Sequence, residues 1–169
     1  FSATGSVTAG NSAQTTDGAA ASLLMSGEAV EKYGVKPIAK IVAYAVAGCR
    51  ADEMGVGPAY AVPKALALAG LKVEDIGLWE LNEAFASQCM YAMQQLGLYD
   101  QRELWESTSD KRIVNVNGGA IALGNPLGWT GAKLCAQLMN EMRERGVKYG
   151  VESMCIGGGI GAAAVFELC

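Results

Sequence analysis

The chain has 169 residues, of which 51% are hydrophobic and 18% are charged, so it can bury the core of one ordinary domain. Its net charge of −4, without a basic stripe, argues against nucleic acid as a partner, and its apolar stretches are too short to span a membrane. The lack of histidine and of any cysteine cluster argues against a metal site such as zinc.

Hydrophobic periodicity and turn residues predict alternating helices and strands. In chain order, the expected elements are a helix over 17–33, a strand over 37–48, a helix over 58–69, a strand over 76–81, a helix over 84–96, a surface loop over 98–111, a strand over 113–116, a helix over 131–145, and strands over 149–156 and 160–168. The last two strands are joined too tightly for a crossover and should pair antiparallel. These elements predict a layered α/β domain in which a mixed five-stranded sheet carries helices on both faces.

Two glycine-rich segments are the most informative part of the chain. The first reads KRIVNVNGGAIALGNPLGWTG over 111–131, and the second, MCIGGGIG over 154–161, carries a single cysteine, Cys155. Glycine lets a backbone come close to a ligand, so turns of this kind can bring N–H groups to a substrate carbonyl.

Spaced motifs across nearly the whole chain resemble the C-terminal half of a thiolase. They are TAGN (8–11) with DGAAA (17–21), MGVGP (54–58), NEAFA (82–86), NVNGGAIALG-N-PLG-TG (115–131) and CIGGG-GAAAVFE (155–167). The sequences around the last two motifs resemble those of degradative 3-ketoacyl-CoA thiolases, of the fatty acid β-oxidation type, more than those of biosynthetic thiolases. Residues 1–169 are then expected to form the C-terminal thiolase domain, with the N-terminal half absent from this chain.

The resemblance implies an acyltransferase. An enzyme cysteine, which lies in the N-terminal half in this family, takes an acyl group from a thioester, and a Claisen step then makes or breaks the carbon–carbon bond of a 3-ketoacyl-CoA. The implied substrates are CoA and acyl-CoA, which is a coenzyme A thioester. No permanently bound cofactor is implied. The implied partners are the N-terminal thiolase half and further copies, in a dimer or tetramer.

The cysteines divide into one candidate catalytic thiol and four others. Cys155 matches the second catalytic cysteine of thiolases, which moves the proton at the substrate α-carbon, and the backbone dipoles of the glycine turn are expected to lower its pKa. The alternative for Cys155 is a small core residue. We expect Cys49, Cys89 and Cys135 to lie on apolar core faces. Five spaced cysteines without a CxxC pair indicate a reducing compartment, either the cytoplasm or a mitochondrial or peroxisomal matrix.

Several other motif residues have either a functional or a purely structural role. Gly157 matches a position whose N–H points into an oxyanion hole, or it simply serves a tight turn. Asn82 matches the asparagine that holds a polarising water, or it caps the following helix, whose start Glu83 would stabilise. Ala13 stands near the expected pantetheine arm, where the family often has serine. Trp129 either shapes the acyl tunnel or anchors a helix start.

Asn125 departs from the family pattern. Thiolases carry histidine between the residues that match Gly124 and Pro126, and this histidine both donates to the thioester oxygen and accepts the nucleophile's proton. An asparagine amide can still donate, but it cannot take up and release a proton near neutral pH. Asn125 is therefore either an engineered change in a thiolase or the mark of a diverged subunit with impaired catalysis that binds acyl-CoA or acts as a scaffold.

Overall fold

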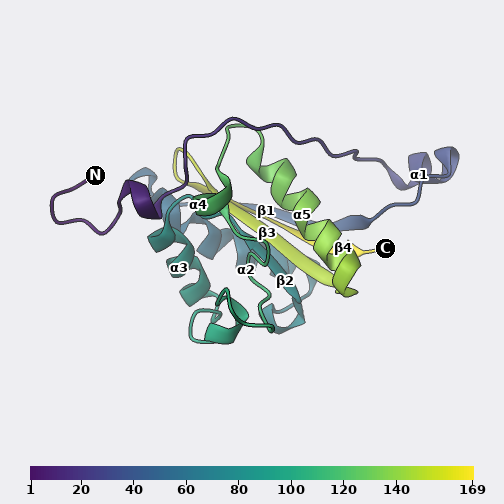
Figure 1. The fold of residues 1–169 in the computed structure, drawn as a ribbon. Helices are drawn as coiled ribbons and strands as arrows, with labels where there is room; N and C mark the ends of the chain where they lie inside the picture. The colour runs from purple at the N-terminus through teal and green to yellow at the C-terminus, as the bar shows by residue number, and fades with distance from the viewer.

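The computed structural model describes residues 1–169 as a mixed sheet between helices (Figure 1). The helices are α1 (Gly27–Tyr33), α2 (Gly57–Ala69), α3 (Ala86–Gln95), α4 (Ala120–Leu123) and α5 (Thr130–Arg145), and the strands are β1 (Ala39–Gly48), β2 (Leu78–Leu81), β3 (Tyr149–Ile156) and β4 (Ile160–Leu168). Short 3₁₀ turns lie over Ala9–Asn11, Ala51–Val56, Val73–Asp75 and Arg102–Leu104. None of the helices is long and apolar enough to cross a bilayer.

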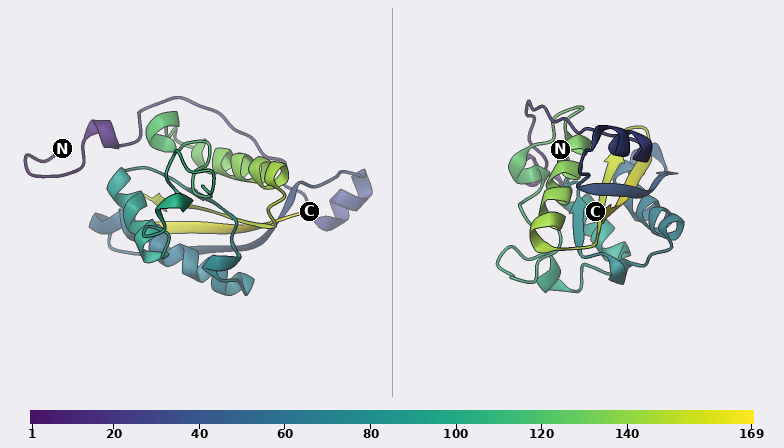
Figure 2. Two further views of the ribbon diagram at one scale, coloured as in Figure 1. Left: turned by 60° about the horizontal axis from the view of Figure 1, so that its bottom comes forward. Right: turned by 90° about the vertical axis from the view of Figure 1, so that its right-hand side faces the viewer.

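The strands are ordered β1-β4-β3-β2 across the sheet. The β3–β4 hairpin is antiparallel, as predicted, β4 also pairs antiparallel with β1, and β2 runs parallel to β3. Helix α5 covers one face of the sheet, and α2 and α3 lie on the other (Figure 2). The expected helices on both faces are therefore confirmed.

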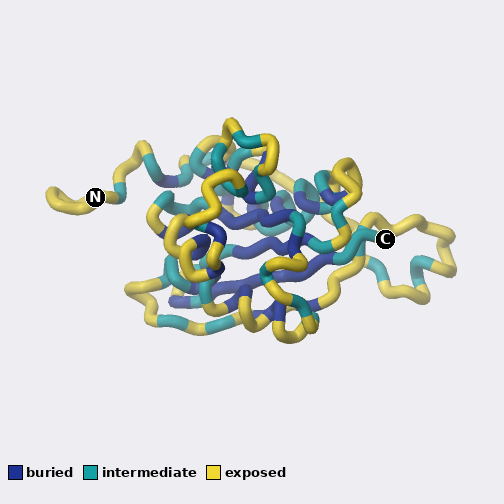
Figure 3. Tube along the Cα trace, turned by 90° about the horizontal axis from the view of Figure 1, so that it is seen from below, coloured by how far each residue is buried: buried dark blue, intermediate teal, exposed yellow.

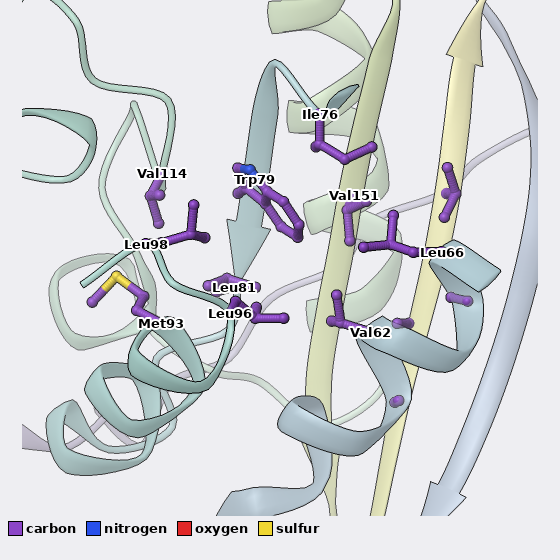
Figure 4. Close-up of a cluster of buried hydrophobic side chains, with 14 of the residues drawn as sticks. Val62, Leu66, Ile76, Trp79, Leu81, Met93, Leu96, Leu98, Val114 and Val151 are labelled. Carbon is purple, nitrogen blue, oxygen red and sulfur yellow. The ribbon is translucent and has the colours of Figure 1, made fainter. Parts of the chain in front are cut away.

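Each face of the sheet has its own core. The larger cluster lies between the sheet and helices α2 and α3, and its members include Trp79 of β2, Val62 of α2 and Met93 of α3 (Figure 4). The smaller cluster lies beneath α5 and includes Leu138 and Phe166. Buried residues accordingly follow the strands, while the segment leading into and out of α1 is exposed along most of its length (Figure 3).

The predicted fifth strand is wrong, and the sheet has four strands. Over 113–116 only Val114 forms a bridge, with Trp79. The chain turns at once because Asn115 has a positive φ of 46°. The Asn115 side chain takes over the pairing, since its Oδ1 accepts from the Leu81 N–H at 2.8 Å and its Nδ2 donates to the Leu81 carbonyl at 2.9 Å.

The predicted helix over 17–33 is wrong in its first ten residues, because only Gly27–Tyr33 is helical. Ser26 caps this helix by accepting from the Ala29 N–H at 3.2 Å. The residues before it run as an extended segment across the top of α5 (Figure 1). Leu23 and Leu24 are 82% and 78% exposed, so this part of the chain has no apolar surface within the chain against which a helix could pack.

Candidate active site

Two amide side chains from distant parts of the chain meet where β2 ends. Asn82 directly follows β2, and Asn125 lies in the loop between α4 and α5. The Asn82 Nδ2 donates to the Asn125 Oδ1 at 3.3 Å, and the hydroxyl of Thr130 donates to the same oxygen at 2.7 Å. Asn82 is only 4% exposed, and its own Oδ1 is buried without a partner. The pair thus offers one free acceptor, on Asn82, and one free donor, on Asn125.

The local structure shows why Asn82 faces this loop. Its N–H donates to the Ser153 carbonyl at 2.9 Å, which continues the β2–β3 pairing by one residue and fixes the backbone. The alternative in which Asn82 caps α3 is wrong, because the N-cap residue is Phe85 and no side chain caps this helix. A buried amide that does not serve a helix end is a stronger candidate for ligand contact.

Glu83 stabilises a helix start, but a different one from the helix expected. Its carboxylate accepts from the Asn115 Nδ2 at 2.8 Å and from the Ile121 N–H at 3.4 Å. Ile121 is the second residue of α4, so the carboxylate lies at the N-terminus of α4 rather than α3. Glu83 thereby ties the segment after β2 to the glycine-rich turn that leads to Asn125.

Residues 12–18, which we call the strap, cross the site on its outer side. The Ala13 N–H donates to the Ala84 carbonyl at 2.9 Å, and the Thr16 Oγ1 accepts from the Asn125 N–H at 3.2 Å. Gly18 lies against Trp129, where an added Cβ would come within 3.2 Å of the ring. Ala13 therefore lies beside the NEAFA segment, and Trp129 packs against the strap.

Cys155 is the penultimate residue of β3 and is half-buried. Burial raises the pKa of its thiol, and a backbone hydrogen bond offsets only part of that rise. The expectation of a lowered pKa is therefore wrong in its net direction. The thiol makes no hydrogen bond with Asn82 or Asn125. The charge of an ionised Cys49 adds to the rise in the pKa of Cys155, and the charge of an ionised Cys155 adds to the rise in the pKa of Cys89.

The remaining thiols follow the core prediction in part. Cys89 is buried, and burial raises its pKa to about 12. Cys135 is half-buried and packs against the core beneath α5. Cys49 is also half-buried, but it lies just after β1, with its thiol 3.8 Å from the Glu53 carbonyl.

The glycine turn after Cys155 does not need a glycine at each position. Gly158 and Gly159 have positive φ values of 92° and 88°, and a side chain at Gly159 would collide with the Cys49 carbonyl. Gly157 has no such φ, is exposed, and would carry a Cβ with nothing within 4 Å. The tight turn therefore explains why glycine stands at Gly158 and Gly159 but not why it stands at Gly157. The surface of Gly157 is open to a ligand.

An apolar cleft of about 530 Å³ opens beside this region, between Ala51–Val56 and α3. Met54 and Phe85 line it, and Gln88, 7% exposed, has a buried Oε1 without a partner at its wall. This cleft and the hydroxyls of Thr16 and Thr130 were not predicted from the sequence. The MGVGP and NEAFA motifs could have indicated the cleft, whereas nothing in the sequence places Thr16 beside Asn125.

Comparisons with known proteins identify the family of this chain. The family model for the thiolase C-terminal domain matches residues 35–168. The chain is 54% identical over 169 residues to the 3-ketoacyl-CoA thiolase of Bacillus subtilis (strain 168), covering 100% of this chain and 40% of the relative. It is 50% identical over 168 residues to the peroxisomal 3-ketoacyl-CoA thiolase of Homo sapiens, covering 99% and 37% of the two chains.

Solved structures give the same result. Human mitochondrial 3-ketoacyl-CoA thiolase in complex with CoA is similar with a TM-score of 0.83 and 42% identity, over 100% of this chain and 40% of that one. Bacillus anthracis acetyl-CoA acetyltransferase is similar with a TM-score of 0.87 and 40% identity, again over 100% and 40%. The chain therefore spans about 40% of the length of these proteins. It belongs to the thiolase family, in which it corresponds to the C-terminal domain.

Proposed function

We propose that this chain supplies the C-terminal half of a 3-ketoacyl-CoA thiolase. The enzyme would transfer an acyl group between a cysteine and CoA and cleave or form the carbon–carbon bond of a 3-ketoacyl-CoA. The names of the relatives support this activity, and the solved complex with CoA supports a CoA thioester as the substrate. Because the chain spans about 40% of its relatives, the nucleophilic cysteine would come from an N-terminal half.

The observation that carries the proposal is the hydrogen bond between Asn82 and Asn125. The Asn125 Nδ2 has no partner within the chain and can donate to a thioester oxygen, where negative charge develops in acyl transfer. The buried, unpartnered Oδ1 of Asn82 can accept from a water molecule that polarises the second carbonyl. Both roles are those expected of these positions in a thiolase.

Cys155 would act as the acid in the degradative direction. When the carbon–carbon bond breaks, the electron pair stays on the α-carbon of the departing acetyl-CoA, and the thiol proton moves to that carbon and leaves a thiolate. A raised pKa keeps the thiol protonated near neutral pH, so it suits donation better than abstraction. The open surface of Gly157 leaves room for the substrate beside this thiol.

Asn125 would slow one step selectively. The amide retains the donor to the thioester oxygen but provides no base for the nucleophile's proton. General base catalysis typically contributes ~10²–10⁴ in rate, so we place the slow step at acyl loading of the nucleophile.

The exposed side of β1 supports the proposed partners. Ile41, Tyr44 and Val46 are 50%, 57% and 41% exposed, although a strand of this composition is usually covered. We assign this face to contacts with the N-terminal half or with a further subunit of a dimer or tetramer. The five free cysteines fit a reducing compartment, the cytoplasm or an organelle matrix.

The test is acyl loading measured by intact-protein mass. The chain is joined to the part of the Bacillus subtilis relative that precedes the matched region and is incubated with a 3-ketoacyl-CoA. The proposal predicts a slow mass increase by one acyl group, which is reversed by added CoA. A protein that binds the thioester but never gains an acyl group would contradict it and favour a binding or scaffold role.

A further inference from the structure

We propose that Thr130 is a positioning residue for Asn125. Its hydroxyl group holds the Asn125 carbonyl oxygen so that the Nδ2 hydrogens of the amide are turned toward the thioester. This inference rests on the proposed function, because the amide nitrogen is given the thioester oxygen as its acceptor.

The hydrogen bonds around Asn125 determine which way its amide points. A carbonyl oxygen has two lone pairs, and on Asn125 Oδ1 both are in use, by Thr130 at 2.7 Å and by Asn82 at 3.3 Å. The Nδ2 group has no partner within the chain. Turning over the Asn125 amide alone would place its Nδ2 against the Nδ2 of Asn82, donor against donor.

Thr130 is the better anchored of the two donors. It is the first residue of α5, a 16-residue helix packed on β2 and β3, and it is 8% exposed. Its Oγ1 also lies 3.2 Å from the Pro126 carbonyl, which restricts its rotamer. The Asn125 backbone is held separately through Thr16. Removal of the hydroxyl should therefore free the amide without releasing the loop.

The first test uses the 169-residue chain itself. Side-chain order of the Asn125 Nδ2 group is measured by ¹⁵N relaxation in the wild type, Thr130→Val, Thr130→Ser and the control Thr15→Val, whose residue is exposed and makes no side-chain hydrogen bond. We expect Thr130→Val to lower this order, and the serine variant and the control to keep it. Unchanged order in Thr130→Val would overturn the proposal.

The second test is turnover with the N-terminal half joined. Loss of one hydrogen bond that matters in the transition state predicts a kcat roughly tenfold lower for Thr130→Val with KM for the 3-ketoacyl-CoA nearly unchanged, and rescue by Thr130→Ser. A raised KM with unchanged kcat would overturn the positioning role. Wild-type protein without any turnover would instead overturn the proposed function, while the relaxation data would still decide how the amide is held.

Discussion

Two buried carboxyl groups should make this chain less stable as the pH rises toward neutrality. Glu80 of β2 and Glu152 of β3 are register partners and are 2% and 6% exposed. The Gln137 Nε2 donates to one oxygen of Glu80 at 2.9 Å, and each carboxyl has one buried oxygen without a partner. Burial is the main cause that raises both pKa values, each from 4.5 to about 7.

The sign of the effect follows from proton binding. Between pH 4.5 and 7 the folded chain holds protons on these carboxyls that the unfolded chain has released, so the free energy of unfolding falls as the pH rises through this window. A shift from 4.5 to about 7 corresponds to about 3 kcal/mol for each carboxyl. Lys133 opposes the rise at Glu80, whereas Glu83 and Glu141 add to it, and Glu80 adds to the rise at Glu152.

The assay is urea unfolding followed by circular dichroism at several pH values across this window. From the acidic to the neutral end of this pH window, the free energy of unfolding of Glu152→Gln should fall by about 3 kcal/mol less than that of the wild type. The matched control is Glu167→Gln on β4, whose partly exposed carboxylate pairs with Lys40 at 2.7 Å and has a lowered pKa. The control should not flatten the pH dependence. Equal pH slopes for the wild type and Glu152→Gln would show that the Glu152 carboxyl does not hold a proton in the folded chain.

Two further predictions concern the site. Gly157→Ala should change the free energy of unfolding by less than about 0.5 kcal/mol but lower the rate of acyl transfer. Gly159→Ala should lower the free energy of unfolding by about 2 kcal/mol or more, because Gly159 has a positive φ and its added Cβ would collide with the Cys49 carbonyl. Urea unfolding and turnover of both variants check this contrast, and equal losses of stability would contradict it. Asn125→His should raise the rate of acyl loading by about 10²-fold in the joined protein, as followed by rapid-quench mass measurement, and no gain would show that a missing base does not limit this step.

The sequence predicts the parts of the fold whose pattern is long and periodic. The β3–β4 hairpin and α5 follow their expected ranges because alternation and helical spacing persist over many residues. The predicted strand over 113–116 is wrong because of one residue, Asn115. Its positive φ ends the backbone pairing with β2, and its side chain forms hydrogen bonds with the Leu81 backbone instead. The helix over 17–33 fails in its first part because Leu23 and Leu24 find no core within the chain against which to pack.

The candidate site could likewise be predicted only in part. Motifs indicate Asn82 and Asn125, and the structure joins them by a hydrogen bond. The hydroxyls of Thr16 and Thr130 emerge only from the folded chain, because the Thr16 contact spans 109 residues and no local pattern specifies it. The pKa of Cys155 could not be predicted either, since it depends on how far the end of β3 is buried.

Exchange of the acetyl methyl protons of acetyl-CoA with deuterated water, in the protein joined to its N-terminal half, measures directly whether Cys155 moves the α-proton. We expect deuterium uptake with the wild type and with Asn125→His, and none above background with Cys155→Ala. Uptake with Cys155→Ala at the wild-type rate would show that another group moves the α-proton.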